Sequence, residues 1–273
     1  MHGEVISTTR LSPQLVRVTL GGDGLDDFVP SPYSDSYINA FFLPGGAPYA
    51  VPFDEAEVRS HPRELRPFPR RITVRSWDAE RRELALDFAV HGDIGHAGRW
   101  AIHAKPGDLL QFRGPGGGYS PHADADSYLF VGDESALPAI AVAAEAVPAG
   151  RPVTVVAEVE DAAGEIPLRS PGDLGITWVH RAGRHEDHDN LLAAAVQALP
   201  RPAGTVSAFV HGEAAATRAV RRVLLGDAIV EPEHLSCSPY WRRGHTDEQW
   251  RSVKAAWIRE VEAETGILTR PAR

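Results

Sequence analysis

The chain has 273 residues and a formal net charge of −9, and hydrophobic residues make up 43% of it. This length suits one large domain or two ordinary ones. The acidic balance argues against nucleic acid as the main ligand, because phosphate binding needs a basic surface. The one cysteine, Cys237, excludes an internal disulfide and indicates a reducing compartment. No stretch reaches the roughly 20 apolar residues of a membrane helix, and Met1–Glu4 has no signal-peptide features. We therefore expect a cytoplasmic protein without a membrane anchor.

Residues 1–120 show the period-two alternation of half-buried strands. Val16, Val18 and Leu20, for example, alternate with polar neighbours. The expected strands are Gly3–Thr9, Leu15–Leu20, Tyr37–Leu43, Arg71–Trp77, Glu83–Val90 and Leu109–Arg113, with one short helix at Gly98–His103. Six such strands predict a closed antiparallel β-barrel, since closure removes exposed sheet edges. The aperiodic stretch Gly46–Pro69 is expected to be a long surface loop.

After the glycine- and proline-rich linker Gly114–Asp126, uninterrupted apolar runs alternate with helical stretches. The expected strands are Tyr128–Val131, Val153–Val159, Ile176–His180, Val206–Val210 and His234–Cys237, and the expected helices are Ala136–Val147, Asn190–Leu199 and Glu213–Leu225. This alternation is typical of a parallel sheet covered on both faces. We therefore expect a second domain of α/β type, a nucleotide-binding domain over residues 127–273, after a barrel domain over residues 1–120.

The end of the chain predicts a terminal helix. Thr246 and Gln249 form a capping box at its start. The stripe Trp250, Val253, Trp257 and Val261 is more typical of packing than of a cofactor site. Gly266 is the expected stop.

Two segments of the barrel have the residues to bind a dinucleotide. In Arg70–Arg75 a strand opens with arginine, whose planar guanidinium suits a pyrophosphate, and Thr73 adds a hydroxyl. The segment His91–Ala101 runs from a strand through glycines into a short helix, whose free N–H groups form an anion site. Taken alone, each pattern is equally typical of an edge strand or a turn.

The segment Phe130–Ala139 predicts the first βα turn of a nucleotide-binding sheet, where ligands lie at the carboxyl ends of strands. Ser135 is the expected N-cap of the helix, and Pro138 falls in its first turn. A G-x-G-x-x-G fingerprint is missing. His185–Asp189 resembles a metal cluster by composition, but a solvated loop is several times more probable, and Cys237 is expected to be inert.

In their order and spacing, these segments resemble the siderophore-interacting protein family, which are ferric-siderophore reductases within the ferredoxin–NADP reductase superfamily. The matching segments are Arg70–Arg75, His91–Ala101, Gly114–Gly117, Gly132–Ile140, Ile176–Trp178, His211–Ala214 and Tyr240–Gly244. The resemblance covers nearly the whole chain, and Gly132–Ile140 and Tyr240–Gly244 are its most specific parts. The chain departs from the family at Ile72, where a tyrosine usually stacks on the isoalloxazine, and at His96 and Gly98, where proline and serine are usual.

The resemblance implies a monomer that holds FAD on the barrel and NADPH or NADH on the α/β domain, and that reduces a ferric siderophore. It assigns to FAD the residues Arg70, Arg71, Ile72, Thr73, Val90, His91, Gly95, His96, Ala97, Gly98 and Trp100. It assigns to the nicotinamide cofactor Gly132, Asp133, Glu134, Ser135, Ala136 and Glu213, and to the anionic siderophore Arg75, Arg242 and Arg243. No catalytic side chain and no protein-bound metal are expected, since the cofactors carry the chemistry.

Two alternatives stay open at this point. One is a different flavin reductase on the same scaffold, with another electron acceptor. The other is a protein with little or no flavin that only binds a ferric chelate, an alternative favoured by Ile72, His96 and Gly98. In addition, one of Arg242 and Arg243 is as readily explained as an anchor of the terminal helix.

Overall fold

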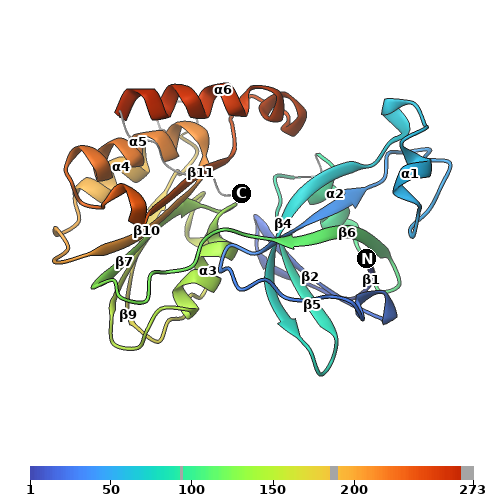
Figure 1. Ribbon diagram of the computed structural model, residues 1–273, viewed down its shortest axis with the longest axis horizontal. Coiled ribbons are helices and arrows are strands. Elements are labelled where there is room, and N and C mark those ends of the chain that lie inside the picture. Colours follow the sequence, from blue (N-terminus) through green and yellow to red (C-terminus); the bar gives the residue numbers. More distant parts are fainter. Residues whose placement is uncertain (93–94, 185–189, 266–273) are drawn as a thin grey trace. The chain divides into compact units, whose positions relative to one another are not determined.

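The computed structural model describes residues 1–92, 95–184 and 190–265. They divide into two compact units, Met1–Gly117 and Gly118–Arg273. The first unit is a closed barrel in which neighbouring strands follow the order β1-β2-β5-β4-β3-β6 (Figure 1). Its strands are β1 (His2–Ser12), β2 (Leu15–Gly21), β3 (Tyr37–Phe42), β4 (Phe68–Asp78), β5 (Glu83–Ala89) and β6 (Leu109–Gly116). Every pair in the barrel is antiparallel, so the predicted barrel is confirmed.

The barrel closes around apolar side chains that alternate along each strand. On β2, Val16, Val18 and Leu20 are buried, with the polar neighbours between them partly exposed. Phe88 and Phe112 add large rings to the same core. Burial of this kind stabilises the fold by about 25 cal/mol per Å² of apolar surface, and it also fixes the register, because a one-residue slip would expose the whole set.

The segment predicted as a long surface loop contains two short helices, α1 (Glu55–Val58) and η2 (Arg63–Leu65). Asp54 caps α1 by accepting hydrogen bonds from the backbone N–H groups of Ala56 and Glu57. An Asp followed three residues later by Glu57 is a helix-start signal that the sequence does offer. The backbone of Phe53 also exchanges two hydrogen bonds with the Gln111 side chain on β6, which ties the segment to the barrel.

The second unit is a five-stranded sheet in the order β11-β10-β7-β8-β9, with every neighbouring pair parallel. Its strands are β7 (Ser127–Asp133), β8 (Pro152–Val159), β9 (Asp173–His180), β10 (Val206–Glu213) and β11 (Leu235–Trp241). Its helices are α3 (Leu137–Glu145), α4 (Leu191–Gln197), α5 (Ala214–Gly226) and α6 (Asp247–Thr265), with short turns η3 (Ala162–Gly164) and η5 (Pro232–His234). The predicted parallel sheet is confirmed.

The order of the strands determines where this unit can bind a ligand. The chain winds outward from β7 through β8 to β9, then returns to place β10 and β11 on the other side of β7. The reversal between β7 and β10 is a topological switch point, the usual ligand site of such sheets. Helices α4 and α5 pack on one face, where Val131 and Val210 meet Val220 and Leu224, and α3 lies on the opposite face (Figure 1).

The terminal helix α6 is fixed by one apolar cluster and by ion pairs of its Glu264 with Arg218 and Arg222 of α5. Trp250, Trp257 and Val261 are buried together with Ala214 at the start of α5. Val253 is 38% exposed, so its assignment to the buried stripe was wrong: it lies on the solvent side of the helix. The capping box is confirmed, because the Thr246 N–H donates to Gln249 Oε1 at 2.8 Å and the Gln249 N–H donates to Thr246 Oγ1 at 3.2 Å.

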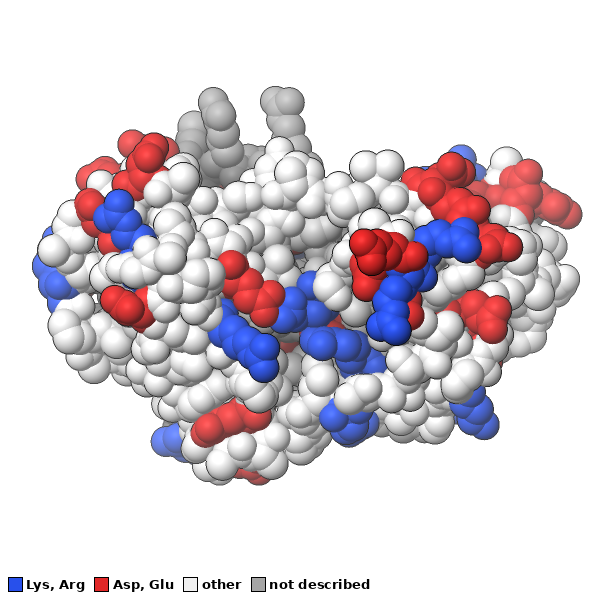
Figure 2. All heavy atoms as spheres, turned by 90° about the horizontal axis from the view of Figure 1, so that it is seen from below, with Lys and Arg blue, Asp and Glu red and all other residues white. Residues whose placement is uncertain are grey.

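Gly266, the predicted stop of this helix, lies outside the described residues. Acidic and basic side chains adjoin one another on the face shown in Figure 2, as expected for a surface with many ion pairs. Within the described ranges, no helix is both long and apolar enough to cross a membrane.

Candidate functional site

Strand β4 presents its predicted ligand residues in two directions. Ile72 is 7% exposed and lies in the barrel core, directly opposite Ile38 of β3. Arg71 points outward, with its guanidinium carbon 4.7 Å from the centre of the Tyr37 ring. Arg70 reaches back along the strand, where it donates to the Pro69 carbonyl at 3.0 Å. Arginine and Thr73 therefore remain accessible, whereas Ile72 offers little surface to a ligand.

Because Ile72 is a core residue, restoring the family's tyrosine at this position should harm the protein. We expect Ile72→Tyr to lower the free energy of unfolding by about 1–3 kcal/mol, since extra ring atoms overpack a filled core. Urea denaturation measures the change. Thr8→Tyr, on the exposed side of β1, is the matched control and should stay within about 0.5 kcal/mol of the native chain. An Ile72→Tyr protein of native stability that bound FAD more tightly would contradict this.

The loop after β5 leads into α2 (Ala97–His103). Gly95 has a φ of +73°, a conformation that favours glycine. The His96 ring stacks on Phe68 of β4, with ring centres 3.6 Å apart and planes 8° apart. A Cβ added to Gly98 would lie 3.4 Å from the Ala89 carbonyl oxygen, an ordinary contact, so a small side chain would fit at this position. The loop and β4 thus meet through an aromatic stack.

The remaining predicted flavin residues of this loop differ in exposure. Val90 is buried and its N–H donates to the Gln14 carbonyl at 2.8 Å. His91 is exposed and Ala97 is partly buried. Trp100 packs edge-on against Phe42, with ring centres 5.8 Å apart. Of these four residues, His91 is the one classed as exposed to solvent.

Beside the stack lies a cavity of about 700 Å³, bordered by Phe68, Gly95, His96, Arg99, Trp100 and His103 among others. This volume is in the range of small-molecule sites. Aromatic rings suit an adenine ring, and guanidinium and imidazole groups suit phosphates. The residues present therefore fit the adenosine and phosphate portion of a flavin dinucleotide.

The turn between β7 and α3 needs its glycines. A Cβ on Gly132 would lie 2.6 Å from both the Ala136 Cβ and the His211 carbonyl oxygen. Gly212, on the adjacent end of β10, has a φ of +139°, and its Cβ would lie 2.8 Å from the Asp133 carboxylate. Both glycines are therefore required by packing within the unit, next to the switch point where ligands of such sheets usually lie. This part of the second unit fits a nicotinamide cofactor.

The prediction that Ser135 is an N-cap was wrong. The N-cap of α3 is Ala136, without a side-chain hydrogen bond, while Pro138 does lie in the first turn. The Ser135 hydroxyl instead donates to Asp133 Oδ1 at 2.5 Å.

Asp133 is 3% exposed and accepts four hydrogen bonds. Its Oδ1 accepts from the N–H and the hydroxyl of Ser135, at 2.9 and 2.5 Å. Its Oδ2 accepts from the N–H of Glu213 and from the Trp241 indole, both at 2.8 Å. One carboxylate therefore connects the carboxyl ends of β7, β10 and β11.

Removing one acceptor oxygen from this arrangement should be costly. We expect Asp133→Asn to lower the free energy of unfolding by about 1–3 kcal/mol, because its amide group cannot accept from all four donors and leaves buried ones unpaired. Asp227→Asn, an exposed position after α5, is the control and should change little. Urea unfolding of both variants measures the difference, and equal stability of the two would show that Asp133 is not a structural link.

Glu134 belongs to an ion-pair network that the sequence analysis missed. Arg181, just after β9, pairs with both oxygens of Glu134, with Glu158 Oε1 at 3.2 Å and with Glu160 Oε2 at 3.3 Å. Burial raises the pKa of Glu158 to about 7, although Arg181 opposes the shift. The closely spaced Glu158 and Glu160 at the end of β8 were the available sequence signal for this network. Their shared partner, Arg181, lies more than twenty residues further along the chain.

This pKa predicts a pH dependence of stability. Glu158 ionises near pH 4.5 when unfolded but near pH 7 when folded. Its stabilising contribution is therefore complete below pH 4.5 and is lost as the pH rises towards 7, by at most about 3 kcal/mol. Glu158→Gln cannot ionise, so its unfolding free energy, measured in urea from pH 5 to 8, should fall less steeply than that of the native chain. Parallel curves would disprove the raised pKa.

The segment at the end of β11 contacts this edge through backbone and side chain. The Arg243 N–H donates to Glu213 Oε1 at 3.1 Å, and Glu213 caps α5 through its other oxygen. The Arg242 guanidinium lies 6.0 Å from the centre of the Trp250 ring on α6, a contact that fits an anchor of the terminal helix. Arg75 lies on β4 of the first unit and is partly exposed.

Two buried groups near this edge take no obvious part in chemistry. Burial lowers the pKa of His211 to about 3, and its ring stacks on Phe209 at 3.8 Å, so it is uncharged at neutral pH. Burial raises the pKa of Cys237 to about 12, which makes the thiol unreactive. His185–Asp189 lie outside the described residues, and among the residues described no group of three or more potential ligands could hold a metal ion.

Comparison with known proteins agrees with both units. A model of the siderophore-interacting FAD-binding domain matches residues 4–119, and a model named siderophore-interacting protein matches residues 125–244. The ferric vibriobactin reductase ViuB of Vibrio cholerae is 35% identical over 248 residues, which cover 89% of this chain and 90% of that protein. The chain belongs to the siderophore-interacting protein family.

Two further relatives match this chain over nearly their whole length. An uncharacterized protein of Mycobacterium tuberculosis is 40% identical over 282 residues, which cover 96% of both chains. A crystal structure of a siderophore utilization protein from T. fusca superimposes with a TM-score of 0.79 at 35% identity, and covers 90% of this chain and 94% of that one. The fold and the chain length of this family member are therefore those of its relatives.

Proposed function

We propose that the protein is an FAD-dependent ferric-siderophore reductase, which passes electrons from a nicotinamide cofactor through FAD to a ferric chelate and so releases Fe(II). One observation carries the proposal: a single chain of this family has, on a barrel, a cavity that fits the adenosine and phosphate portion of FAD and, on a parallel sheet, a switch point bordered by glycines. A relative named as a ferric vibriobactin reductase supports the substrate class. The protein is proposed to act in the cytoplasm as a monomer.

We assign the flavin to the barrel. The guanidinium groups of Arg70 and Arg71 neutralise the pyrophosphate, and Thr73 hydrogen-bonds the flavin edge. The loop supplies backbone and ring contacts through Val90, His91, Gly95, His96, Ala97, Gly98 and Trp100, whereas Ile72 supports the strand from inside the core. FAD, when bound, accepts a hydride and releases electrons singly. The protein's part is to bind and orient it.

We assign the nicotinamide cofactor to the end of β7 and β10. Gly132 and Gly212 allow close packing at these strand ends, and α3, which begins next to Ala136, directs the positive end of its helix dipole towards the phosphates. Asp133, Ser135 and Glu213 hold these elements in place through their mutual hydrogen bonds. Glu134 fixes the neighbouring turn by pairing with Arg181.

The ferric siderophore is the substrate, and arginines supply its attraction. Arg75 and Arg243 are the proposed contacts, and Arg242 contributes both charge and the packing on Trp250. Local positive charge raises the rate of encounter with an anion even on a chain of net charge −9. No side chain has to act as acid, base or nucleophile, because one-electron reduction of the iron weakens its hold on hard oxygen donors.

The arginine assignment predicts a change in apparent KM. In protein loaded with FAD and supplied with NADH or NADPH, Arg75→Gln/Arg243→Gln should raise the apparent KM for an anionic ferric siderophore several-fold at low salt. Its salt dependence should also flatten, because exposed charges are screened beyond about 10 Å at 0.1 M salt. Fe(II) is measured with a coloured ferrous chelator. Arg242→Gln is the comparison variant, and it should instead lower the melting temperature.

The same assay separates the alternatives. If FAD shows no saturable binding at tens of micromolar, the alternative of a protein that only binds a ferric chelate is supported. Flavin that is reduced by the nicotinamide cofactor but passes nothing to any ferric siderophore would indicate a reductase with a different acceptor. An unchanged KM in the double variant would place the siderophore away from these arginines.

A further inference from the structure

We infer that the second unit selects NADH over NADPH, because the end of its sheet near the adenosine ribose is kept acidic. The inference deepens the proposed function and rests on it for the place where the cofactor binds. It concerns the carboxyl ends of β8 and β9 and the residues that follow them.

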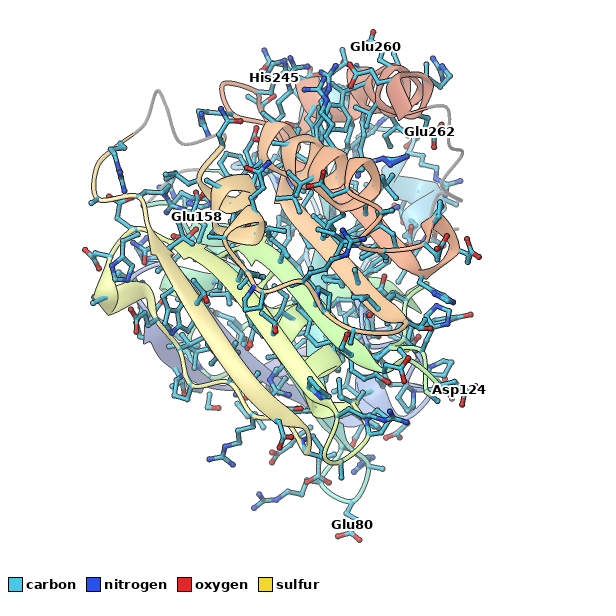
Figure 3. The ribbon with its side chains drawn as sticks, turned by 90° about the vertical axis from the view of Figure 1, so that its left-hand side faces the viewer. Glu80, Asp124, Glu158, His245, Glu260 and Glu262 are labelled. Carbon is cyan, nitrogen blue, oxygen red and sulfur yellow. The ribbon has the colours of Figure 1, made fainter. Side chains whose placement is uncertain are left out.

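The geometry starts from the parallel register of three strands. Asp133 of β7 lies opposite Glu158 of β8, and Glu158 lies opposite Val179 of β9. The carboxyl ends of the three strands therefore meet at one edge. Figure 3 shows Glu158 towards this end of the sheet and Asp124, which precedes β7, at the other.

Among the described residues of this network, carboxylates outnumber the guanidinium group that they bind. Arg181 is bound by three carboxylates: Glu134 through both oxygens, Glu158 at 3.2 Å and Glu160 at 3.3 Å. The Arg181 side chain is 13% exposed, so its charge is compensated and largely withdrawn from solvent. The pKa of Glu158, raised by burial to about 7, leaves it partly ionised at neutral pH. The network as a whole therefore carries an excess of negative charge.

The position matches the one that distinguishes the two cofactors. In sheets of this type, an acidic residue roughly 20 residues beyond the first turn accepts a hydrogen bond from the ribose 2′-hydroxyl of NADH. In proteins that bind NADPH, a nearby arginine accommodates the 2′-phosphate instead. Here the end of β8 carries Glu158 and Glu160, and the Glu160 side chain is the more exposed, at 29%. A 2′-phosphate placed there would meet carboxylates.

One other guanidinium lies close to the network. Arg184 is exposed, and it donates to the carbonyl oxygens of Arg181 at 3.0 Å and His180 at 2.7 Å. It is thereby held against the end of β9. The imidazole of His180 is already within 2.8 Å of another carboxylate, Glu165. Arg184 is therefore the described residue whose replacement tests whether a guanidinium at this edge binds the 2′-phosphate of NADPH.

The test measures binding of the oxidised cofactors, so that it needs no electron transfer. Protein loaded with FAD is titrated by calorimetry with NAD⁺ and with NADP⁺ at low salt. We expect NAD⁺ to bind at least tenfold more tightly, a difference of about 1.4 kcal/mol. Equal or tighter binding of NADP⁺ overturns the inference, as does the absence of detectable binding by either.

Variants identify the residues responsible. Glu158→Gln/Glu160→Gln should raise the affinity for NADP⁺ at least tenfold, and Glu160→Gln alone, at the more exposed position, should raise it several-fold if the double variant folds poorly. Asp124→Asn/Asp227→Asn is the matched control: it replaces two carboxylates at the opposite edge, where Asp227 borders a cavity with the start of β7, and should leave the ratio of affinities unchanged.

Two further outcomes count against the inference. An unchanged ratio in both glutamate variants would show that these carboxylates do not select the cofactor. A loss of NADP⁺ binding in Arg184→Gln would show that this arginine receives the 2′-phosphate. Reduction of the flavin and of a ferric siderophore is recorded separately. If those reactions proceed while NADP⁺ is preferred, the proposed function stands and the selectivity inference fails.

Discussion

The second unit depends on one buried carboxylate. Asp133 receives hydrogen bonds from Ser135, Glu213 and Trp241, which belong to three segments far apart in the sequence. Four hydrogen bonds satisfy both of its buried oxygen atoms. Because each donor is a backbone or side-chain group at the end of a strand, the same bonds align β7, β10 and β11. Gly132 and Gly212 are then required, since any side chain on them would occupy the space this alignment closes.

Next to Asp133, a second group of buried charges is held together by ion pairs around a single guanidinium. Arg181 is surrounded by three carboxylates, and burial without enough compensating charge shifts the pKa of Glu158 towards neutrality. Asp133 thus gives this edge rigidity, while the Arg181 network gives it an acidic character. The two share neighbouring residues, Asp133 and Glu134, on a single turn. The shape and the charge of this turn are therefore set by adjacent positions of the chain.

Periodicity was sufficient to predict most of the fold. The alternation of Val16, Val18 and Leu20 predicted a barrel strand, and uninterrupted runs such as Val153–Val159 predicted a parallel one. Local patterns failed where a tertiary partner competes with a local one. The sequence predicts Ser135 as an N-cap, but its hydroxyl donates to the Asp133 carboxylate. Val253 fits an apolar stripe, yet α6 buries a narrower face than its sequence suggests.

The candidate site was predictable only where a motif is continuous in sequence. Glycine-rich turns mark Gly95 and Gly132, but nothing in the sequence links Arg181 to Glu134. The side on which a strand residue lies was equally hidden, so Ile72 could be matched to a flavin platform although it packs inside the barrel.

The mutual hydrogen bonds of Asp133, Glu213 and Trp241 have a consequence for how such sequences are compared. These residues belong to the most recognisable stretches of the chain, yet the Asp133 carboxylate is occupied by the backbone N–H of Glu213 and by the indole of Trp241. A homologue that had ceased to use a nicotinamide cofactor would still need them to keep its sheet edge intact. Their presence in a genome therefore reports a preserved scaffold. Evidence of retained chemistry has to be sought at more exposed positions, such as Glu160 and Arg75.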